Sequence, residues 1–266
     1  MIRPHKSSPL TFFGLVFALS IPFWVAGALI TRQLLPALPL SAIGFLCPGS
    51  AAAIIVYREN GWAGVSKLLK RSFDFGHIGA KAWLVPVILL QPGIMALSYE
   101  VIHLTGVPVP LPQFSLLPAL ALFVAFFIGA LGEELGWSGY AIDPLKDRFG
   151  ALWASILLGA VWAVWHFVPL LEAHRSLVFI AWWSIGTMAS RVIIVWLFNN
   201  TGESVFVAVI YHAIMNLTWQ LFPVNGSYYD PRVTGLITVI VAVVVVIVWG
   251  SRTFTRPGAT QLEHQG

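Results

Sequence analysis

LTFFGLVFALSIPFWVAGALI, the stretch from Leu10 to Ile30, contains 21 residues and no charged side chain. A helix of this length can cross the hydrocarbon core of a bilayer, which is about 30 Å thick. The apolar region of a secretory signal peptide is shorter, at about 7–15 residues. We therefore interpret the stretch as a retained transmembrane helix.

The rest of the chain has the same character. Of its 266 residues, 58% are hydrophobic and 10% are charged, whereas a soluble domain has about 25% charged residues. This composition excludes a soluble globular or disordered chain, and the single cysteine excludes a disulfide scaffold. The apolar runs are continuous rather than alternating, which argues against a β-barrel.

The sequence therefore predicts an all-α, polytopic membrane protein. We expect a bundle of about eight helices that forms a single transmembrane domain over residues 1–266, with the chemically important core at 115–222. The candidate spans are Leu10–Ile30, Leu34–Tyr57, Ala82–His103, Ser115–Leu145, Phe149–Leu171, Ser176–Phe198, Ser204–Phe222 and Val233–Gly250.

Basic residues predict the orientation of this bundle. If the N-terminus is cytoplasmic, the cytoplasmic segments hold Arg3, Lys6, Arg58, Lys67, Lys70, Arg71, Lys81, Lys146, Arg148, Arg252 and Arg256, and the outer segments hold only Arg32, Arg175 and Arg232. Cytoplasmic loops are normally enriched in Lys and Arg. We expect an integral protein of a bacterial cytoplasmic membrane with both termini inside. The net charge of +4 indicates contact with anionic membrane lipids and not with nucleic acid.

A few polar side chains are predicted at membrane depth, where ionisable groups cost several kcal/mol and usually serve a function. They are Glu133, Glu134, His166, Arg191, His212 and Asn216. Glu133 lies 16 residues before Phe149, and His166 lies 17 residues after it. In an antiparallel helix pair that turns near Phe149, the two side chains would have equal depth.

Helix geometry also predicts which of these groups point together. His212 and Asn216 are four residues apart and share one helix face. Glu133 and Glu134 are about 100° apart around a helix, so they cannot point in the same direction. We expect one carboxylate to face a reaction centre and the other to hold a neighbouring helix or histidine.

The chemistry that this set permits is the activation of water. A buried carboxylate can act as a general base, while histidine and amide groups can donate hydrogen bonds to a developing oxyanion. Alternatively, Glu133, His166 and His212 could bind zinc and leave one position for water. No H-E-x-x-H motif occurs, so the sequence does not indicate a conventional zincin. The choice between a metal-free site and a zinc site stays open at the level of sequence.

Three motifs resemble those of the CPBP (CAAX-protease and bacteriocin-processing, or ABI) family of intramembrane proteases. The first is Gly132-Glu133-Glu134 with Trp137-Ser138-Gly139 behind it, the second is Trp162-Ala163-Val164-Trp165-His166, and the third is His212-Ala213-Ile214-Met215-Asn216. They occur in the family's order on separate candidate helices. The sequence departs from the family pattern at Ser138, where the first motif has Arg, and at Trp162, where Phe is more usual.

The resemblance implies hydrolysis of a peptide bond within the membrane, by enzymes described both as metalloproteases and as metal-independent glutamate proteases. By resemblance, Glu133 and His166 match the pair that activates water, and Glu134 matches a supporting carboxylate. His212 and Asn216 match the oxyanion side. The implied substrate is a peptide or protein, with or without a lipid modification, that enters laterally or from the cytoplasm.

Two other functions fit parts of the sequence. Ser138 removes a positive charge next to the Glu pair, which favours a catalytically weak or inactive scaffold with a role in bacteriocin immunity or trafficking. We hypothesise that Arg191 supplies the missing charge from the sixth helix. A transporter with a proton relay would use the same buried charges, but it would favour internal repeats, which the sequence lacks.

Overall fold

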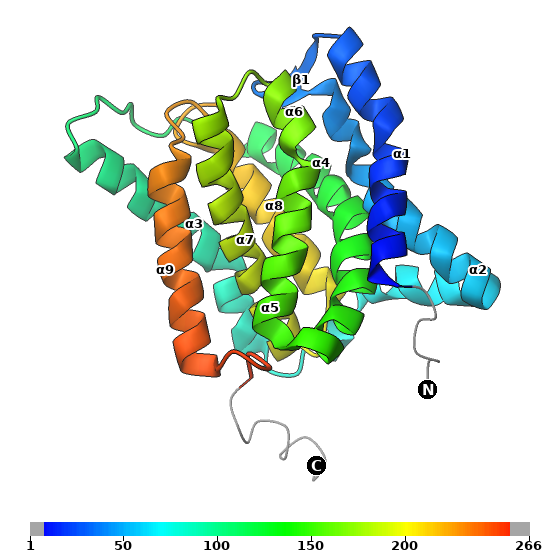
Figure 1. The fold of residues 1–266 in the computed structure, drawn as a ribbon. Coiled ribbons are helices and arrows are strands. Elements are labelled where there is room, and N and C mark those ends of the chain that lie inside the picture. The colour runs from blue at the N-terminus through cyan, green and yellow to red at the C-terminus, as the bar shows by residue number, and fades with distance from the viewer. Residues whose placement is uncertain (1–7, 256–266) are drawn as a thin grey trace.

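In the computed structural model, residues 8–255 are described and form a helical bundle (Figure 1). The helices are α1 (Pro9–Leu29), α2 (Leu46–Lys70), α3 (Leu84–Leu104), α4 (Leu116–Gly136), α5 (Ile142–Trp165), α6 (Phe167–Glu172), α7 (Leu177–Asn200), α8 (Val205–Leu221) and α9 (Pro231–Trp249). Short 3-10 turns occupy Leu40–Phe45, Arg71–Phe73, Phe75–His77 and Lys81–Trp83, and a two-stranded hairpin joins β1 (Gln33–Leu35) to β2 (Leu38–Pro39).

The all-α class and the membrane location are confirmed. Six helical segments of the described chain are long and apolar enough to cross a membrane, one of them the 50-residue segment Leu116–Trp165, and Val205–Leu221 is a shorter apolar helix. The burial pattern is the reverse of a soluble protein. On α4, the apolar side chains of Leu120, Val124 and Ile128 are more than half exposed, whereas Glu134 is fully buried.

Two predicted spans have different boundaries in the structure. The second span does not begin at Leu34 but at Leu46, because Gln33–Pro39 forms the small hairpin with Ala37 at φ 61°. The fifth span is not one helix to Leu171, since α5 ends at Trp165 and α6 follows. Pro169 lacks the N–H that would bond to the carbonyl of Trp165 in a continuous helix, which accounts for the break at His166.

The predicted hairpin between the fourth and fifth spans is present. The helical path departs from α geometry at Gly150, which has φ 74° and ψ 168°, next to the expected turn at Phe149. Glycine adopts positive φ without a steric penalty. The chain therefore reverses there, and the Trp162 side chain on the returning helix reaches Glu133.

A π-helical turn, Trp137–Ala141, follows directly after the Glu pair. Such turns are rare and occur often at functional sites. On the same segment, Gly132 and Gly136 let α4 approach α2 closely. A Cβ atom at Gly136 would lie 2.5 Å from the Pro48 backbone, and one at Gly132 would lie 2.8 Å from the Phe45 carbonyl oxygen.

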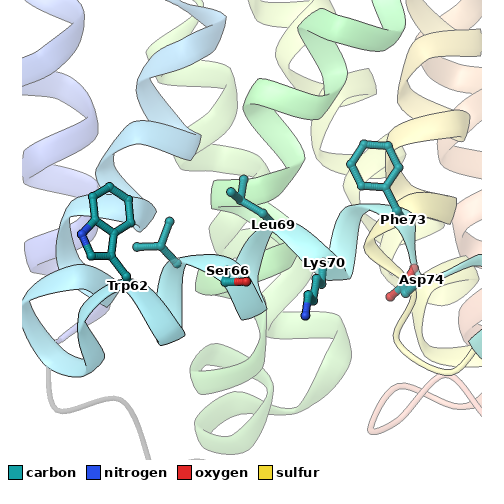
Figure 2. Close-up of a pocket in the computed structure, with 7 residues that line it drawn as sticks. Trp62, Ser66, Leu69, Lys70, Phe73 and Asp74 are labelled. Atoms are coloured by element: carbon teal, nitrogen blue, oxygen red, sulfur yellow. The ribbon is translucent and has the colours of Figure 1, made fainter.

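The second half of α2 lies across the bundle. Helical geometry is interrupted at Gly61, which has φ 61°, and the segment from Trp62 to Phe73 then runs sideways beneath upright helices (Figure 2). Trp62 and Phe73 project to one side and are 74% and 67% exposed, whereas Lys70 projects to the other side (Figure 2). This arrangement of aromatic and basic side chains is typical of a helix at a membrane interface.

The packing order places α7 and α8 inside the bundle. Helix α7 packs against α5 and α9, while α8 packs against α3 and α4. The start of α1 and the end of α9 lie toward the same end of the bundle (Figure 1). The polar side chains expected at membrane depth lie on α4, α7 and α8 and at the end of α5, so this packing brings them to the centre of the molecule.

Candidate active site

Glu134 is the centre of a buried polar cluster. Its carboxylate accepts hydrogen bonds from Arg191 Nη1 at 2.8 Å and from Arg191 Nη2 at 3.0 Å, and from His212 Nδ1 at 2.9 Å. The Ser138 hydroxyl also donates to it. Glu134 and Arg191 are both 0% exposed. Because a buried charge is costly unless it is paired and hydrogen-bonded, these contacts explain how two charges persist at this depth.

This chain has Ser138 where the first motif of the resembled family has Arg. Arg191 provides a positive charge beside the same Glu pair. Its guanidinium comes from α7 and binds the second Glu of the pair in a bidentate geometry, which is the strongest arrangement for a guanidinium and a carboxylate. It also lies over the Trp162 ring, with the guanidinium carbon 4.3 Å from the ring centroid. The location expected for Arg191 beside the Glu pair is thus observed.

Glu133 points away from this ion pair, as the 100° offset predicts. Its Oε2 atom accepts a hydrogen bond from Trp162 Nε1 at 2.7 Å and a longer one from Trp137 Nε1 at 3.4 Å. Two indole N–H groups therefore fix the carboxylate. The substitution of Trp for the more usual Phe at position 162 creates one of these donors, which the sequence motif did not reveal.

His166 lies at the junction between α5 and α6. Its Nδ1 atom is 2.9 Å from the carbonyl oxygen of Trp162. A carbonyl can only accept, so Nδ1 carries the proton and Nε2 is left for other partners. The imidazole is surrounded by the rings of Trp162, Trp165 and Trp183, with centroids 5.6, 4.7 and 5.3 Å away. The Glu133 carboxylate and this ring line the same cavity.

A cavity of about 510 Å³ joins most of the predicted residues. Glu133, His166, His212 and Asn216 line it, whereas Glu134 does not. Helices α4 and α8 and the junction between α5 and α6 thus bring one carboxylate, two imidazoles and one amide to a common space. The second carboxylate stays behind His212 and holds its Nδ1 atom, so that the two members of the Glu pair have separate positions.

Gln91 is a lining residue that the sequence reasoning missed. It is a buried amide on α3, and its Oε1 atom lies 3.3 Å from the Tyr211 hydroxyl, which donates to it. The signal was available, because an amide inside an apolar span is unusual. It lies outside the three motifs and was therefore not selected.

The predicted zinc ligands do not form a compact three-ligand group. Among the described residues, no three His, Cys, Asp or Glu side chains are grouped so that they could hold a metal ion. His212 and His166 both direct Nδ1 to protein acceptors. A histidine that binds a metal commonly donates its other ring N–H to a carboxylate or backbone carbonyl, so zinc binding stays a prediction for metal analysis.

The fold and the cluster define an integral membrane protein with an acid, imidazole and amide cavity in its core. A family described as Type II CAAX prenyl endopeptidase Rce1-like matches residues 115–218, which include all three motifs. Among curated proteins, the chain is 27% identical over 273 aligned residues to CAAX prenyl protease 2 of Methanococcus maripaludis, covering 92% of this chain and 96% of that protein.

A second relative is the Lysostaphin resistance protein A of Staphylococcus haemolyticus, with 21% identity over 175 residues, covering 62% of this chain and 45% of that protein. The resemblance to the CPBP family that the three motifs predicted is confirmed by the family match and the archaeal relative. The chain is thus similar to intramembrane CAAX endopeptidases across the segment that carries its buried polar groups.

Proposed function

We propose that this protein is an intramembrane endopeptidase that hydrolyses a peptide bond with a water molecule held by Glu133 and His166. The observation that carries the proposal is the shared cavity of Glu133, His166, His212 and Asn216. These groups include a base, two proton carriers and hydrogen-bond donors, which are the parts that amide hydrolysis needs.

In the proposed reaction, the water oxygen attacks the carbonyl carbon of the scissile bond. The Glu133 carboxylate takes the water proton, and the lone pair of His166 Nε2 accepts a hydrogen bond from the same water. The carbonyl oxygen gains negative charge, which donors on the opposite wall stabilise. The bond from carbon to nitrogen then breaks, and the proton passes from Glu133 to the leaving nitrogen. The products are a carboxylic acid and an amine.

His212 and Asn216 are proposed as the oxyanion side. They are one helical turn apart on α8 and both line the cavity. The 2.9 Å contact with Glu134 fixes the His212 ring through Nδ1, so Nε2 is the atom available to the substrate. Arg191 and Glu134 then act as positioning residues, because they orient His212 without lining the cavity themselves.

The proposed substrate is a peptide or membrane-associated protein, with or without an attached lipid. The name of the archaeal relative refers to prenylated CAAX proteins. The cavity wall includes large apolar side chains such as Phe126, Trp183 and Trp219, which suit an apolar side chain or lipid group. No step of the proposed reaction depends on a metal ion.

Purified protein in detergent, with prenylated and plain C-terminal peptides as substrates, tests this function. His166→Ala removes the second partner of the attacking water and is expected to lower the cleavage rate by about 10²-fold, the lower end of what a group that assists proton transfer contributes. Asn216→Ala should cost about 10²–10³-fold if it removes an oxyanion donor. His103→Ala is a matched control, because this exposed imidazole lies at the end of α3.

Wild-type activity that persists in His166→Ala, His212→Ala and Asn216→Ala would refute the proposal. Metal analysis of the same preparation addresses zinc separately. The alternative of an inactive scaffold rested on the charge lost at Ser138, and the ion pair of Arg191 with Glu134 supports the active enzyme instead. A proton-relay transporter is favoured by no specific observation.

A further inference from the structure

A groove of about 640 Å³ runs along the second half of α2 and the turn that follows it (Figure 2). Residues three and four apart on a helix are neighbours on its surface, and the groove residues recur at this spacing. They are Trp62, Val65, Ser66, Leu69, Lys70, Phe73 and Asp74. The described lining of the core cavity shares no residue with this groove, so the two are separate features of the fold.

The groove combines exposed apolar surface with basic groups. The side chains of Trp62, Leu69 and Phe73 are exposed and project to one side of the segment, while Lys70 projects to the other (Figure 2). Lys67 lies three positions before Lys70 and is exposed as well. An amphipathic segment of this kind lies at the membrane boundary, with its apolar side among acyl chains and its basic side among headgroups.

Asp74 is the acidic residue of the groove wall, but its carboxylate is engaged by the start of α8. One of its oxygens, Oδ1, accepts a hydrogen bond from the Ser204 hydroxyl at 2.6 Å and a longer one from the Phe206 N–H at 3.4 Å. A negative charge is favourable at the N-terminus of a helix. The carboxylate therefore serves α8, and Lys70 is the charged side chain that the groove offers to a ligand.

Exposed apolar side chains beside lysines match the two parts of a phospholipid with an anionic headgroup. We propose that the groove binds one such lipid, with an acyl chain on Trp62, Leu69 and Phe73 and the headgroup phosphate at Lys70. This site lies outside the cavity of the proposed endopeptidase reaction and does not depend on that reaction.

The segment that forms the groove also contacts the two elements that carry the candidate active site. Arg71 Nη1 donates a hydrogen bond to the carbonyl oxygen of Gly139 at 2.8 Å, within the π-helical turn that follows the Glu pair. Asp74 caps α8, the helix of His212 and Asn216. The interfacial segment therefore bonds to both sides of the polar layer.

A ligand that binds one arrangement of a protein raises the population of that arrangement. A lipid in the groove holds the segment in place, and Arg71 and Asp74 then act as positioning residues for the π-helical turn and for α8. Anionic lipid should accordingly raise the rate of peptide cleavage. This consequence, unlike the lipid site itself, rests on the proposed endopeptidase function.

Native mass spectrometry of the purified protein in detergent tests the lipid site without any assay of activity. Wild type should bind added phosphatidylglycerol more tightly than phosphatidylcholine. Lys70→Gln should weaken the binding of phosphatidylglycerol about fivefold, the usual effect of one lysine near an anionic headgroup, and Trp62→Ala should weaken the binding of both lipids. Lys81→Gln is the matched control, because this exposed lysine lies outside the groove.

Two results would overturn the lipid site. One is equal binding of phosphatidylglycerol by wild type, Lys70→Gln and Trp62→Ala, and the other is equal binding of the two lipids by wild type. Both variants change exposed side chains, so the fold should be retained, and if one of them fails to fold the other decides.

Cleavage in vesicles tests the link to the candidate active site. Wild type and Lys81→Gln should cleave a peptide faster in phosphatidylcholine vesicles that contain phosphatidylglycerol than in vesicles that lack it, and Lys70→Gln should lose this gain. Arg71→Met leaves the groove residues unchanged but removes the hydrogen bond to Gly139. It should still bind the lipid in the mass spectrum and yet show no gain in rate.

A wild-type rate that does not depend on phosphatidylglycerol, or an undiminished gain in Arg71→Met, would contradict the link. No cleavage in either kind of vesicle would contradict the proposed function instead. In that case the mass spectra still decide whether the groove binds an anionic lipid.

Discussion

Arg191 and Glu134 are 57 positions apart in sequence and form a bidentate ion pair at 2.8 and 3.0 Å with neither side chain exposed. The pair joins α7 to α4, and the same carboxylate orients His212 on α8. Three helices therefore meet at one charge pair, which links the stability of the bundle to the geometry of the cavity.

Arg191→Ala should strongly destabilise the protein. Removal of one partner leaves the Glu134 carboxylate buried without its main counter-charge, which typically costs about 3–5 kcal/mol. The thermal unfolding midpoint in detergent is the measurement. Arg232→Ala is the control, because its pair with Asp230 is at the surface, and little or no change is expected there. An unchanged midpoint and an unchanged cleavage rate in Arg191→Ala would show that the pair is unimportant.

Ser138→Arg tests whether one guanidinium can replace another. Ser138 is buried and its hydroxyl donates to the same carboxylate that Arg191 binds. A second buried guanidinium at one carboxylate has no counter-charge, so the single variant should unfold at a lower temperature. The exchange Ser138→Arg with Arg191→Ser restores one cation per carboxylate, and we expect the double variant to be more stable than either single variant.

A double-mutant cycle gives the control for this exchange. The two positions share a partner, so their effects should not add. Additive effects of Ser138→Arg and Arg191→Ser on the unfolding midpoint would contradict a common role at Glu134.

Trp162→Phe should lower the cleavage rate while the fold is retained. The Phe ring preserves much of the packing against Arg191 but removes the N–H that donates to Glu133 at 2.7 Å. A hydrogen bond to a charged group contributes about 1.5–3 kcal/mol, which corresponds to a rate loss of up to about 150-fold. Trp153→Phe on the exposed face of α5 is the matched control. Equal rates in the two variants would rule out a role for the indole.

Gly136→Ala should weaken the contact between α4 and α2. The added Cβ atom would lie 2.5 Å from the Pro48 backbone, and overpacking of this kind typically costs about 1–3 kcal/mol. Gly93→Ala on α3 is the control, because a Cβ atom there has no neighbour within 4 Å. The unfolding midpoint should fall only in Gly136→Ala, and a fall of equal size in both variants would contradict close approach as the cause.

Helix periodicity and the cost of buried charge predicted much of the site. The equal spacing of Glu133 and His166 from Phe149 predicted that the returning helix would come level with the Glu pair, and Trp162 indeed contacts Glu133. The free-energy cost of burying a charge also predicted that Arg191 has a partner, because an unpaired guanidinium in an apolar core is strongly unfavourable. That partner is Glu134.

Other features depend on tertiary geometry that periodicity does not contain. The donor role of Trp162 follows from the direction of its side chain, which the sequence does not specify. The hairpin at Gln33–Pro39 replaced the start of a predicted helix, because an apolar Leu- and Pro-rich run fits either structure. The half of the bundle that holds the cavity follows from the packing of α7 and α8, which helix periodicity does not specify.

Glu133→Gln tests the central claim most directly. The amide oxygen can still accept the Trp162 hydrogen bond, so the fold should be retained, but the group can no longer take a proton from water. The initial rate of peptide cleavage by the purified variant should fall to the background of protein-free detergent, with an unfolding midpoint close to that of wild type. Glu100→Gln, at an exposed carboxylate of α3, should cleave at the wild-type rate. Cleavage by folded Glu133→Gln at the wild-type rate would contradict the account.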